Sequence, residues 1–142
     1  MSGSSTFAGF LGSWTLIVDS CDYEQGEPPR AGSYEICERE GRLEFRIEWV
    51  DHDGESHEVE FSGVPDGVPA PFAGGDLADA LAVIAASPRE LNSVASWRGA
   101  ERMIAQRQLD ESGNAMRVVQ VVRFEDGTHA ANTSVYKKRV FN

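Results

Sequence analysis

Basic residues are scarce in this sequence, and so are cysteines and long apolar runs. Its 142 residues include 13 Lys+Arg against 23 Asp+Glu, for a formal net charge of −10. Binding to nucleic acid or to anionic membranes depends on clustered Lys and Arg, so we expect neither as a partner. No run of about 18 apolar residues occurs, and residues 1–12 lack the basic and apolar regions of a signal peptide. We therefore expect a cytoplasmic protein.

Cys21 and Cys37 are the only cysteines, which permits one disulfide or two thiols. Thiols are favoured in a cytoplasmic protein. If a hairpin surrounds the 22–30 loop, residue 21 faces about residue 32 and residue 37 faces about residue 16, which separates the sulfurs by roughly 16 Å. A disulfide requires Cα atoms within about 7 Å, so we predict that the two cysteines are not bonded to each other.

Alternation of apolar and charged residues is clearest over 42–49, where Leu43, Phe45, Ile47 and Trp49 occupy every second position. This is the pattern of a strand with one face in water. A turn at 51–54 and renewed alternation over 57–61 predict a hairpin. Turn residues along the rest of the chain predict strands at 12–20, 31–40, 42–51, 55–63, 90–98, 101–110, 115–125 and 128–139.

Residues 76–86 fit two interpretations. Their composition favours a helix that Pro88 would end, but Leu81, Val83 and Ala85 also have strand spacing, and pairing with neighbours often overrides propensity. We expect a strand near 80–86 after a short helical turn. Short antiparallel strands joined by tight turns favour an up-and-down barrel over a Greek-key sandwich.

Both ends of the chain carry a family resemblance. Residues 10–14, Phe-Leu-Gly-Ser-Trp, have the form F-x-G-x-W, and Ser134-Val135-Tyr136 places an aromatic residue on the last strand. Together they resemble the calycins, the superfamily of lipocalin and fatty-acid-binding barrels, and the order of elements is similar to that of small bacterial lipocalin-like proteins. The resemblance implies that Trp14 plugs one barrel end and that the last strand pairs with the first.

We thus predict an all-β protein with a single up-and-down antiparallel barrel of about 8–10 strands. The barrel would span residues 12–142, and residues 1–11 would form a flexible N-terminal segment. Fatty-acid-binding proteins have a helix–turn–helix lid between their first two strands, and here only the loop 21–30 separates them.

The resemblance also implies a ligand site. Fatty-acid-binding proteins hold a carboxylate with two arginines and a tyrosine, and Arg107-Gln108-Leu109 resembles their Arg-Glu-Leu segment. It implies Arg107 as the first arginine and Tyr136 as the tyrosine. Ser134 stands at the position of the second arginine, so an anion would meet one charge rather than two.

The residues themselves support a modest version of this site. Arg107 shares its strand face with Met103 and Leu109, so an inward-facing apolar row would carry the guanidinium inside, where it needs an acceptor. A ligand anion could be that acceptor, and so could a glutamate or a backbone carbonyl, with the guanidinium reaching water at the rim. Gln120 and Tyr136 could equally be satisfied within the core. The predicted ligand-binding residues are Arg107, Tyr136, Ser134, Gln120, Phe45 and Trp49.

Other chemistry has little support. His52, His57 and His129 are the only histidines, and the first two, near Asp51 and Asp53, read as solvated turn residues rather than a metal pair. His129 is placed like the haem ligand of some calycin-like barrels, but the glycine-rich continuation of those proteins is absent. The Gly-x-Ser-x-Gly motif that positions a catalytic serine does not occur.

We expect no cofactor and no metal, and predict non-catalytic binding of a small, mostly apolar ligand with a polar or anionic end. The alternatives are an isomerase or cyclase using the same cavity, and a barrel filled by its own side chains.

Overall fold

The computed structural model describes residues 7–72 and 78–139, and within them the chain forms one antiparallel sheet of ten strands and a short 3₁₀ helix. The elements are η2 (Ala8–Phe10), β1 (Gly12–Tyr23), β2 (Ala31–Arg39), β3 (Arg42–Val50), β4 (Ser56–Gly63), β5 (Ala70–Pro71), β6 (Ala80–Ser87), β7 (Glu90–Trp97), β8 (Ala100–Leu109), β9 (Ala115–Arg123) and β10 (His129–Lys138). No helix in these two described ranges is long and apolar enough to cross a membrane.

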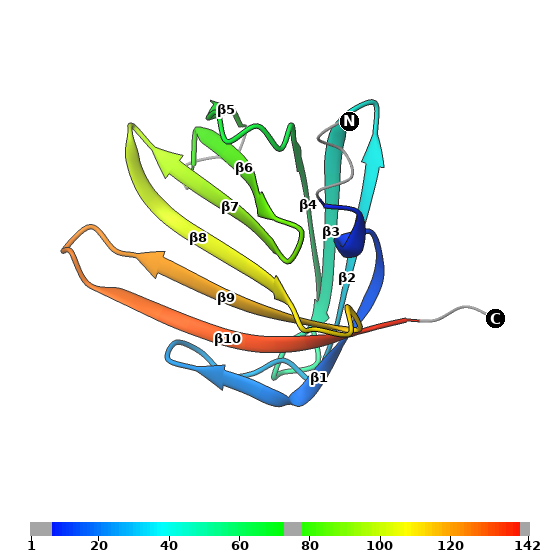
Figure 1. Cartoon of the computed structure of the whole chain (residues 1–142). Coiled ribbons are helices and arrows are strands. Elements are labelled where there is room, and N and C mark those ends of the chain that lie inside the picture. The colour runs from blue at the N-terminus through cyan, green and yellow to red at the C-terminus, as the bar shows by residue number, and fades with distance from the viewer. Residues whose placement is uncertain (1–6, 73–77, 140–142) are drawn as a thin grey trace.

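The strands follow one another around a barrel in the order β4-β3-β2-β1-β10-β9-β8-β7-β6-β5 (Figure 1). Strands that follow one another in sequence pair with each other, except β4 and β5, which form the two edges of the sheet, and β10 returns to pair with β1. This confirms the predicted all-β, up-and-down barrel. All eight predicted strands are present, with their ends shifted by a few residues.

Residues 80–87 form a strand, which confirms the strand expected near 80–86 although the composition of this segment favours a helix. Leu81, Val83 and Ala85 pair with Ala95, Ser93 and Leu91 of β7, and this face lies in or against the hydrophobic core. Burial of one face against the neighbouring strand thus outweighs helix propensity. The short helical turn expected near residue 76 lies outside the described residues, and the two-residue strand β5 was not predicted.

The barrel is nearly closed between its first and last edges. Strands β4 and β6 touch there without a regular ladder. Gly67 donates a backbone hydrogen bond of 2.9 Å to the carbonyl of Val83, and Asp66 forms an isolated bridge with Ile84. A Cβ atom on Gly63 would lie 2.8 Å from Cγ2 of Val83, so the absence of a side chain lets β4 approach β6.

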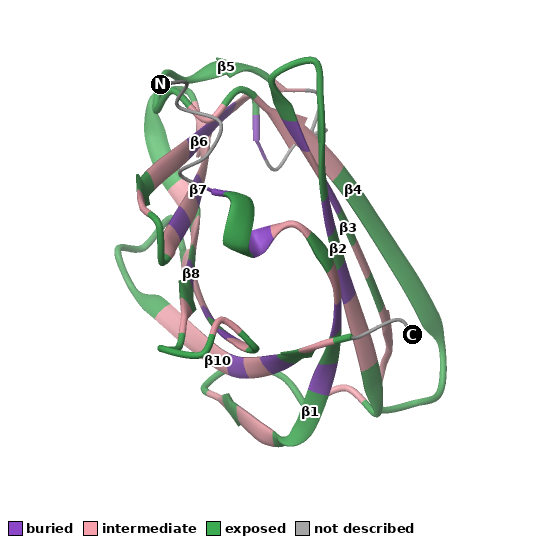
Figure 2. Ribbon diagram, turned by 45° about the vertical axis from the view of Figure 1, so that its right-hand side comes forward, coloured by how far each residue is buried: buried purple, intermediate pink, exposed green. Residues whose placement is uncertain are grey.

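One end of the barrel is plugged by the N-terminal residues. Helix η2 lies within the ring of strands in Figure 2; Phe7, which precedes the helix, and Phe10, its last residue, are 3% and 0% exposed. The indole Nε1 of Trp14, also fully buried, donates a 3.0 Å hydrogen bond to the carbonyl of Phe10. Phe7 and Phe10 belong to the segment 1–11 that we expect from the sequence to be flexible, of which residues 1–6 lie outside the described ranges. Their side chains are instead buried against the core.

The interior follows the predicted alternation. Trp14, Phe45 and Met116 are buried, and Ile47 and Phe61 pack against the same core. Arg42, Arg46 and Glu48 are exposed on the outer face, and Glu44 is partly exposed there. The assignment of alternate residues to the inner and outer faces of the barrel is therefore confirmed.

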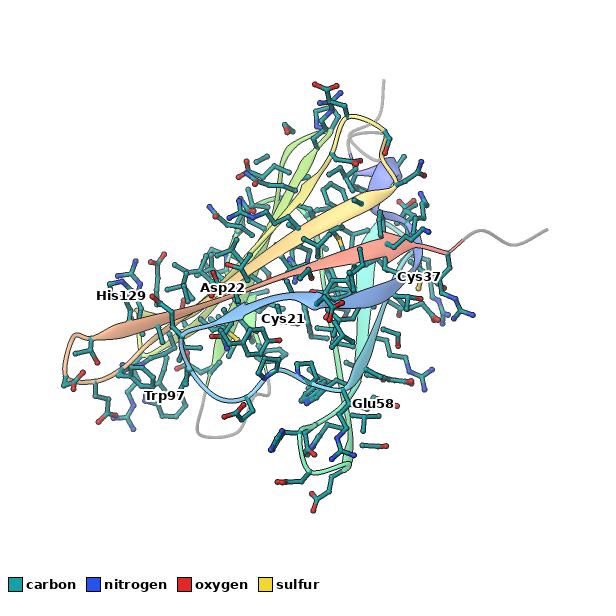
Figure 3. All side chains as sticks on the ribbon, turned by 90° about the horizontal axis from the view of Figure 1, so that it is seen from below. Cys21, Asp22, Cys37, Glu58, Trp97 and His129 are labelled. Carbon is teal, nitrogen blue, oxygen red and sulfur yellow. The ribbon has the colours of Figure 1, made fainter. Side chains whose placement is uncertain are left out.

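Both cysteines are free, as predicted, but the hairpin register behind that prediction is wrong. Trp14 pairs with Tyr34, and the last pair of β1 with β2 is Thr15 with Ser33. Beyond that point β1 continues past an irregularity between Ile17 and Asp22 and pairs only with β10. Cys21 thus lies on a part of β1 that has left β2, and Figure 3 shows it well separated from Cys37.

Candidate ligand site inside the barrel

Along β3 and from Arg107 onward on β8, exposure of the inward-facing side chains rises toward the end of the barrel opposite the plug. The far end is formed by the turns at 51–55, 98–99 and 124–128. On β3, Leu43 is 0% exposed, whereas Trp49, nearer the far end, is partly exposed. On β8, exposure rises from 1% at Arg107 to 37% at Met103. Solvent therefore reaches inward-facing side chains in the far half, and Arg107 lies just below that level.

Arg107 is the only buried charged side chain in the described part of the chain. Its Nε donates a 2.7 Å hydrogen bond to the hydroxyl of Tyr34, and one terminal nitrogen donates at 3.1 Å to Oγ of Ser93. The other terminal nitrogen reaches the carbonyl of Leu91 at 3.5 Å. A guanidinium has five N–H groups, so one on each terminal nitrogen has no partner among these contacts.

All of these partners of Arg107 are neutral. No carboxylate in the described ranges forms an ion pair with it, and the ion pairs present there are all at the surface, on β2 to β4 and the β3–β4 turn. Arginine stays protonated in proteins, and a buried charge is costly unless an opposite charge accompanies it. The geometry therefore presents a buried cation without a charged partner.

Aromatic rings surround this cation. The carbon at the centre of the guanidinium lies 4.7 Å from the ring centroid of Phe45, 5.5 Å from that of Tyr34 and 5.9 Å from that of Phe61. Phe45 and Phe61 stack on each other with centroids 4.6 Å apart. Cation–π attraction offsets part of the cost of burial, by about 2 kcal/mol in desolvated sites, which is less than the several kcal/mol that burying an ion costs.

Tyr136 and Ser134 lie beside Arg107 along the inner wall. Ser134 pairs with Val118, which pairs with Arg107, so the three share one row across β10, β9 and β8. Both Ser134 and Tyr136 are buried. The ring of Tyr136 meets that of Tyr34 edge-on, with centroids 5.2 Å apart.

The Tyr136 phenol is held in its neutral form. Burial raises its pKa far above the ordinary value, and the nearby phenol of Tyr34 acts in the same direction. A hydrogen bond with Ser134 acts in the opposite direction and is the smaller effect. Tyr136 is therefore a neutral hydrogen-bonding group next to the cation.

Gln120 and Trp49 lie farther from Arg107. Gln120 pairs with Ala105, one row nearer the far end, and its amide nitrogen is 2.8 Å from the sulfur of Met103. Trp49 stacks on His57, with ring centroids 5.2 Å apart, at the β3–β4 end. Of the six residues predicted from sequence, Ser134 shares the row of Arg107, Phe45 contacts the guanidinium, and Tyr136 lies one row nearer the plugged end. Gln120 and Trp49 lie nearer the far end.

The two hydroxyl partners of Arg107 were missed by sequence reasoning. Tyr34 is on β2, 73 positions away, and Ser93 is on β7, 14 positions away. Tyr34 and Ile36 are inward-facing residues within a predicted strand, which places Tyr34 inside. Nothing in the local pattern indicates which inward-facing residue on the opposite wall it meets.

Two other features lie on the surface. A hollow of about 120 Å³ on the outer face of β1 to β3 is lined by residues that include Ser33, Glu35 and Arg46, and Arg46 already pairs with glutamates there. At the β3–β4 turn, possible ligand atoms of Asp51, Glu55 and His57 lie within 4.8 Å of one another. Both Asp51 oxygens already accept hydrogen bonds, from the turn backbone and from His57, so this cluster is explained by the turn. His129, at the start of β10, and Trp97, at the end of β7, both lie at the far end (Figure 3).

No protein-family model matches this sequence, and no curated protein matches it. Solved structures do match. The zebrafish ileal bile acid-binding protein complexed with cholic acid has a TM-score of 0.53 at 13% identity, covering 93% of this chain and 100% of that one. The fold is similar to that of fatty-acid-binding-protein-like and lipocalin-like barrels. Bovine odorant-binding protein complexed with its natural ligand has a TM-score of 0.51 at 11% identity, covering 100% of this chain and 79% of that one.

Proposed function

We propose that the protein binds a small, mostly apolar molecule with an anionic end inside its barrel, and that Arg107 holds that end. The observation that carries this proposal is the buried guanidinium with neutral partners. An anion would supply the missing charge and accept the two N–H groups that have no partner within the described residues. Because the ligand would bring one charge to one arginine, we expect monoanions to be preferred.

The burial gradient sets the orientation of such a ligand. Its anionic end would lie at the level of Arg107, and its apolar part would extend toward the far end between Ile47, Trp49 and Val122, which are partly exposed. Ligand sites of this kind combine an apolar lining with a few convergent polar groups. Here the polar groups would be Arg107, Tyr136 and Ser134.

The structural neighbours are consistent with a binding role. The zebrafish protein is described as a bile acid-binding protein in complex with cholic acid, and the bovine protein as an odorant-binding protein in complex with its natural ligand. Neither identity exceeds 13%, so these neighbours support a binding barrel and leave the ligand to be identified by its chemistry.

The test is displacement of anilinonaphthalene sulfonate, an anionic fluorescent probe, from the delipidated protein. Hexadecanoate and hexadecanol have the same chain and differ in charge, so their affinity ratio measures recognition of the anion. We expect the wild type to favour hexadecanoate, and Arg107→Met to weaken its binding by roughly 30-fold or more, since losing one side of a buried charge pair costs about 2 kcal/mol or more.

Arg117→Met is the matched control, because Arg117 is exposed on the outer face of β9. It should leave the ratio unchanged. No saturable displacement by the wild type, or equal hexadecanoate affinity in the wild type and Arg107→Met, would show that the interior is filled by its own side chains or that Arg107 has a structural role.

A further inference from the structure

Gln120 is the one polar residue among the inward-facing side chains of β9 that the structure places between the plugged and far ends. Its neighbours on that face are Met116, Val118 and Val122. The strand register places Gln120 in a row of inward-facing residues that crosses five strands. The other members are Tyr23 of β1, Asn132 of β10, Ala105 of β8 and Ser93 of β7. This row lies one step from Arg107 toward the far end, so a second polar level follows the first.

Most polar groups of this row already have protein partners. The amide oxygen of Asn132 accepts the backbone N–H groups of Glu24 and Gln25, and its nitrogen donates to the Gln25 carbonyl. Oγ of Ser93 accepts a hydrogen bond from Arg107. Their side chains hold the β1–β2 loop and the guanidinium in place.

The carbonyl oxygen of Gln120 differs from these groups. Its amide nitrogen lies 2.8 Å from Sδ of Met103, and a thioether sulfur can only accept a hydrogen bond. The NH₂ group is therefore turned toward Met103, and Oε1 points away from it. Within residues 7–72 and 78–139, no donor is bonded to that oxygen, and the side chain is partly exposed.

The walls of the barrel differ in polarity at this level. Inward-facing residues on β3, β4 and β6 are apolar, namely Ile47, Val59, Phe61 and Val83. An apolar ligand extending from Arg107 would meet hydrocarbon on that side and a fixed carbonyl oxygen on the β9 side. Burying that oxygen under an aliphatic chain would leave it without a hydrogen bond, at a cost of about 1–3 kcal/mol.

From this arrangement we infer that Gln120 forms a second polar subsite, and that the ligand class is anionic amphiphiles carrying a hydrogen-bond donor, such as a hydroxyl, part-way along the chain. Arg107 and Gln120 are diagonal neighbours on β8 and β9, whose Cα atoms lie about 7–8 Å apart. The inference rests on the proposed function and states which anionic ligands the site would prefer.

The experiment compares hexadecanoate with a positional series of monohydroxylated hexadecanoic acids, by displacement of anilinonaphthalene sulfonate from the full chain. One stretch of the series should bind the wild type more tightly than hexadecanoate, by about fivefold for one net hydrogen bond. Gln120→Met, which keeps the length and removes the carbonyl, should abolish this preference and bind hexadecanoate at least as tightly as the wild type does.

Gln106→Met, on the exposed outer face of β8, is the matched control and should keep the preference. Gln120→Leu is a second variant, and circular dichroism shows that each variant is folded. If the wild type binds all the acids equally, or if Gln120→Met retains the preference, the second subsite is refuted while the proposed function stands. If the wild type binds none of them, both are refuted.

Discussion

The Nε–H group of Arg107 on β8 donates a 2.7 Å hydrogen bond to the hydroxyl of Tyr34 on β2, across the interior of the barrel. In the order of strands, β1, β10 and β9 separate the two. The contact therefore joins opposite walls rather than neighbouring strands. It fixes the guanidinium among aromatic rings and leaves one N–H on each terminal nitrogen for another acceptor.

We expect Arg107→Met to leave the stability of the ligand-free protein unchanged or to raise it. Replacing a buried ion by an apolar side chain of similar volume removes its desolvation cost, and such replacements are often neutral or stabilising by about 1–4 kcal/mol. Urea denaturation measures the free energy of unfolding. Arg107→Ala, the control that leaves a cavity, should lower it. A large loss of stability in Arg107→Met would show that the guanidinium stabilises the folded protein.

Tyr34→Phe tests the contact across the barrel directly. It removes only the hydroxyl, so Arg107 Nε loses its partner in a buried setting, and we expect a loss of about 1–3 kcal/mol. In the Arg107→Met background the same change should cost much less, because no charged donor remains. A double-mutant cycle from urea denaturation gives the coupling energy, and a value near zero would contradict the contact.

Gly63→Ala should destabilise the protein at the closure of the barrel. The new methyl would lie 2.8 Å from Cγ2 of Val83, and overpacking of this kind costs about 1–3 kcal/mol. In the Val83→Ala background, where that methyl is absent, the same change should cost little. A substitution at another glycine, such as Gly41→Ala, cannot serve as the control, because alanine would be strained at the φ of +82° found there. If both backgrounds lose equal stability, the contact between β4 and β6 is not the cause.

The alkaline stability of the protein should depend on Tyr136. Burial raises its pKa above the unfolded value of 10.0, so the folded state favours the neutral phenol. The resulting stability is fully present below about pH 10 and is lost as the pH rises toward the higher folded value. Urea midpoints across this range should fall with pH, and Tyr136→Phe should make the fall shallower. Tyr23, whose pKa burial also raises, accounts for part of the remainder. An identical pH profile in the wild type and Tyr136→Phe would refute this role.

The alternation of side chains made much of the fold predictable. At period two, Leu43, Phe45 and Ile47 point to one side of a strand whatever lies opposite, so the inward face could be read locally. The same parity placed Arg107 inside. The turns could be read because their residues favour tight turns regardless of tertiary context.

The local sequence pattern could not predict features whose stability comes from contacts with residues distant in the sequence. Residues 80–87 have helix-forming composition, and pairing with β7 makes them a strand. The register between β1 and β2 depended on an irregularity in β1 that only its pairing with β10 reveals. Phe7 and Phe10 carry no strand pattern, and their burial follows from the need to cover one end of the barrel.

The sequence by itself determined the class of fold, the inward parity of each strand and the presence of a cation on an inward face, because these depend on spacing along one strand. Only the tertiary structure decided which groups meet that cation. Tyr34 and Ser93 reach Arg107 from different strands, and closure of the barrel, rather than any local pattern, sets those distances. The same closure surrounds the charge with rings and hydroxyls instead of a carboxylate.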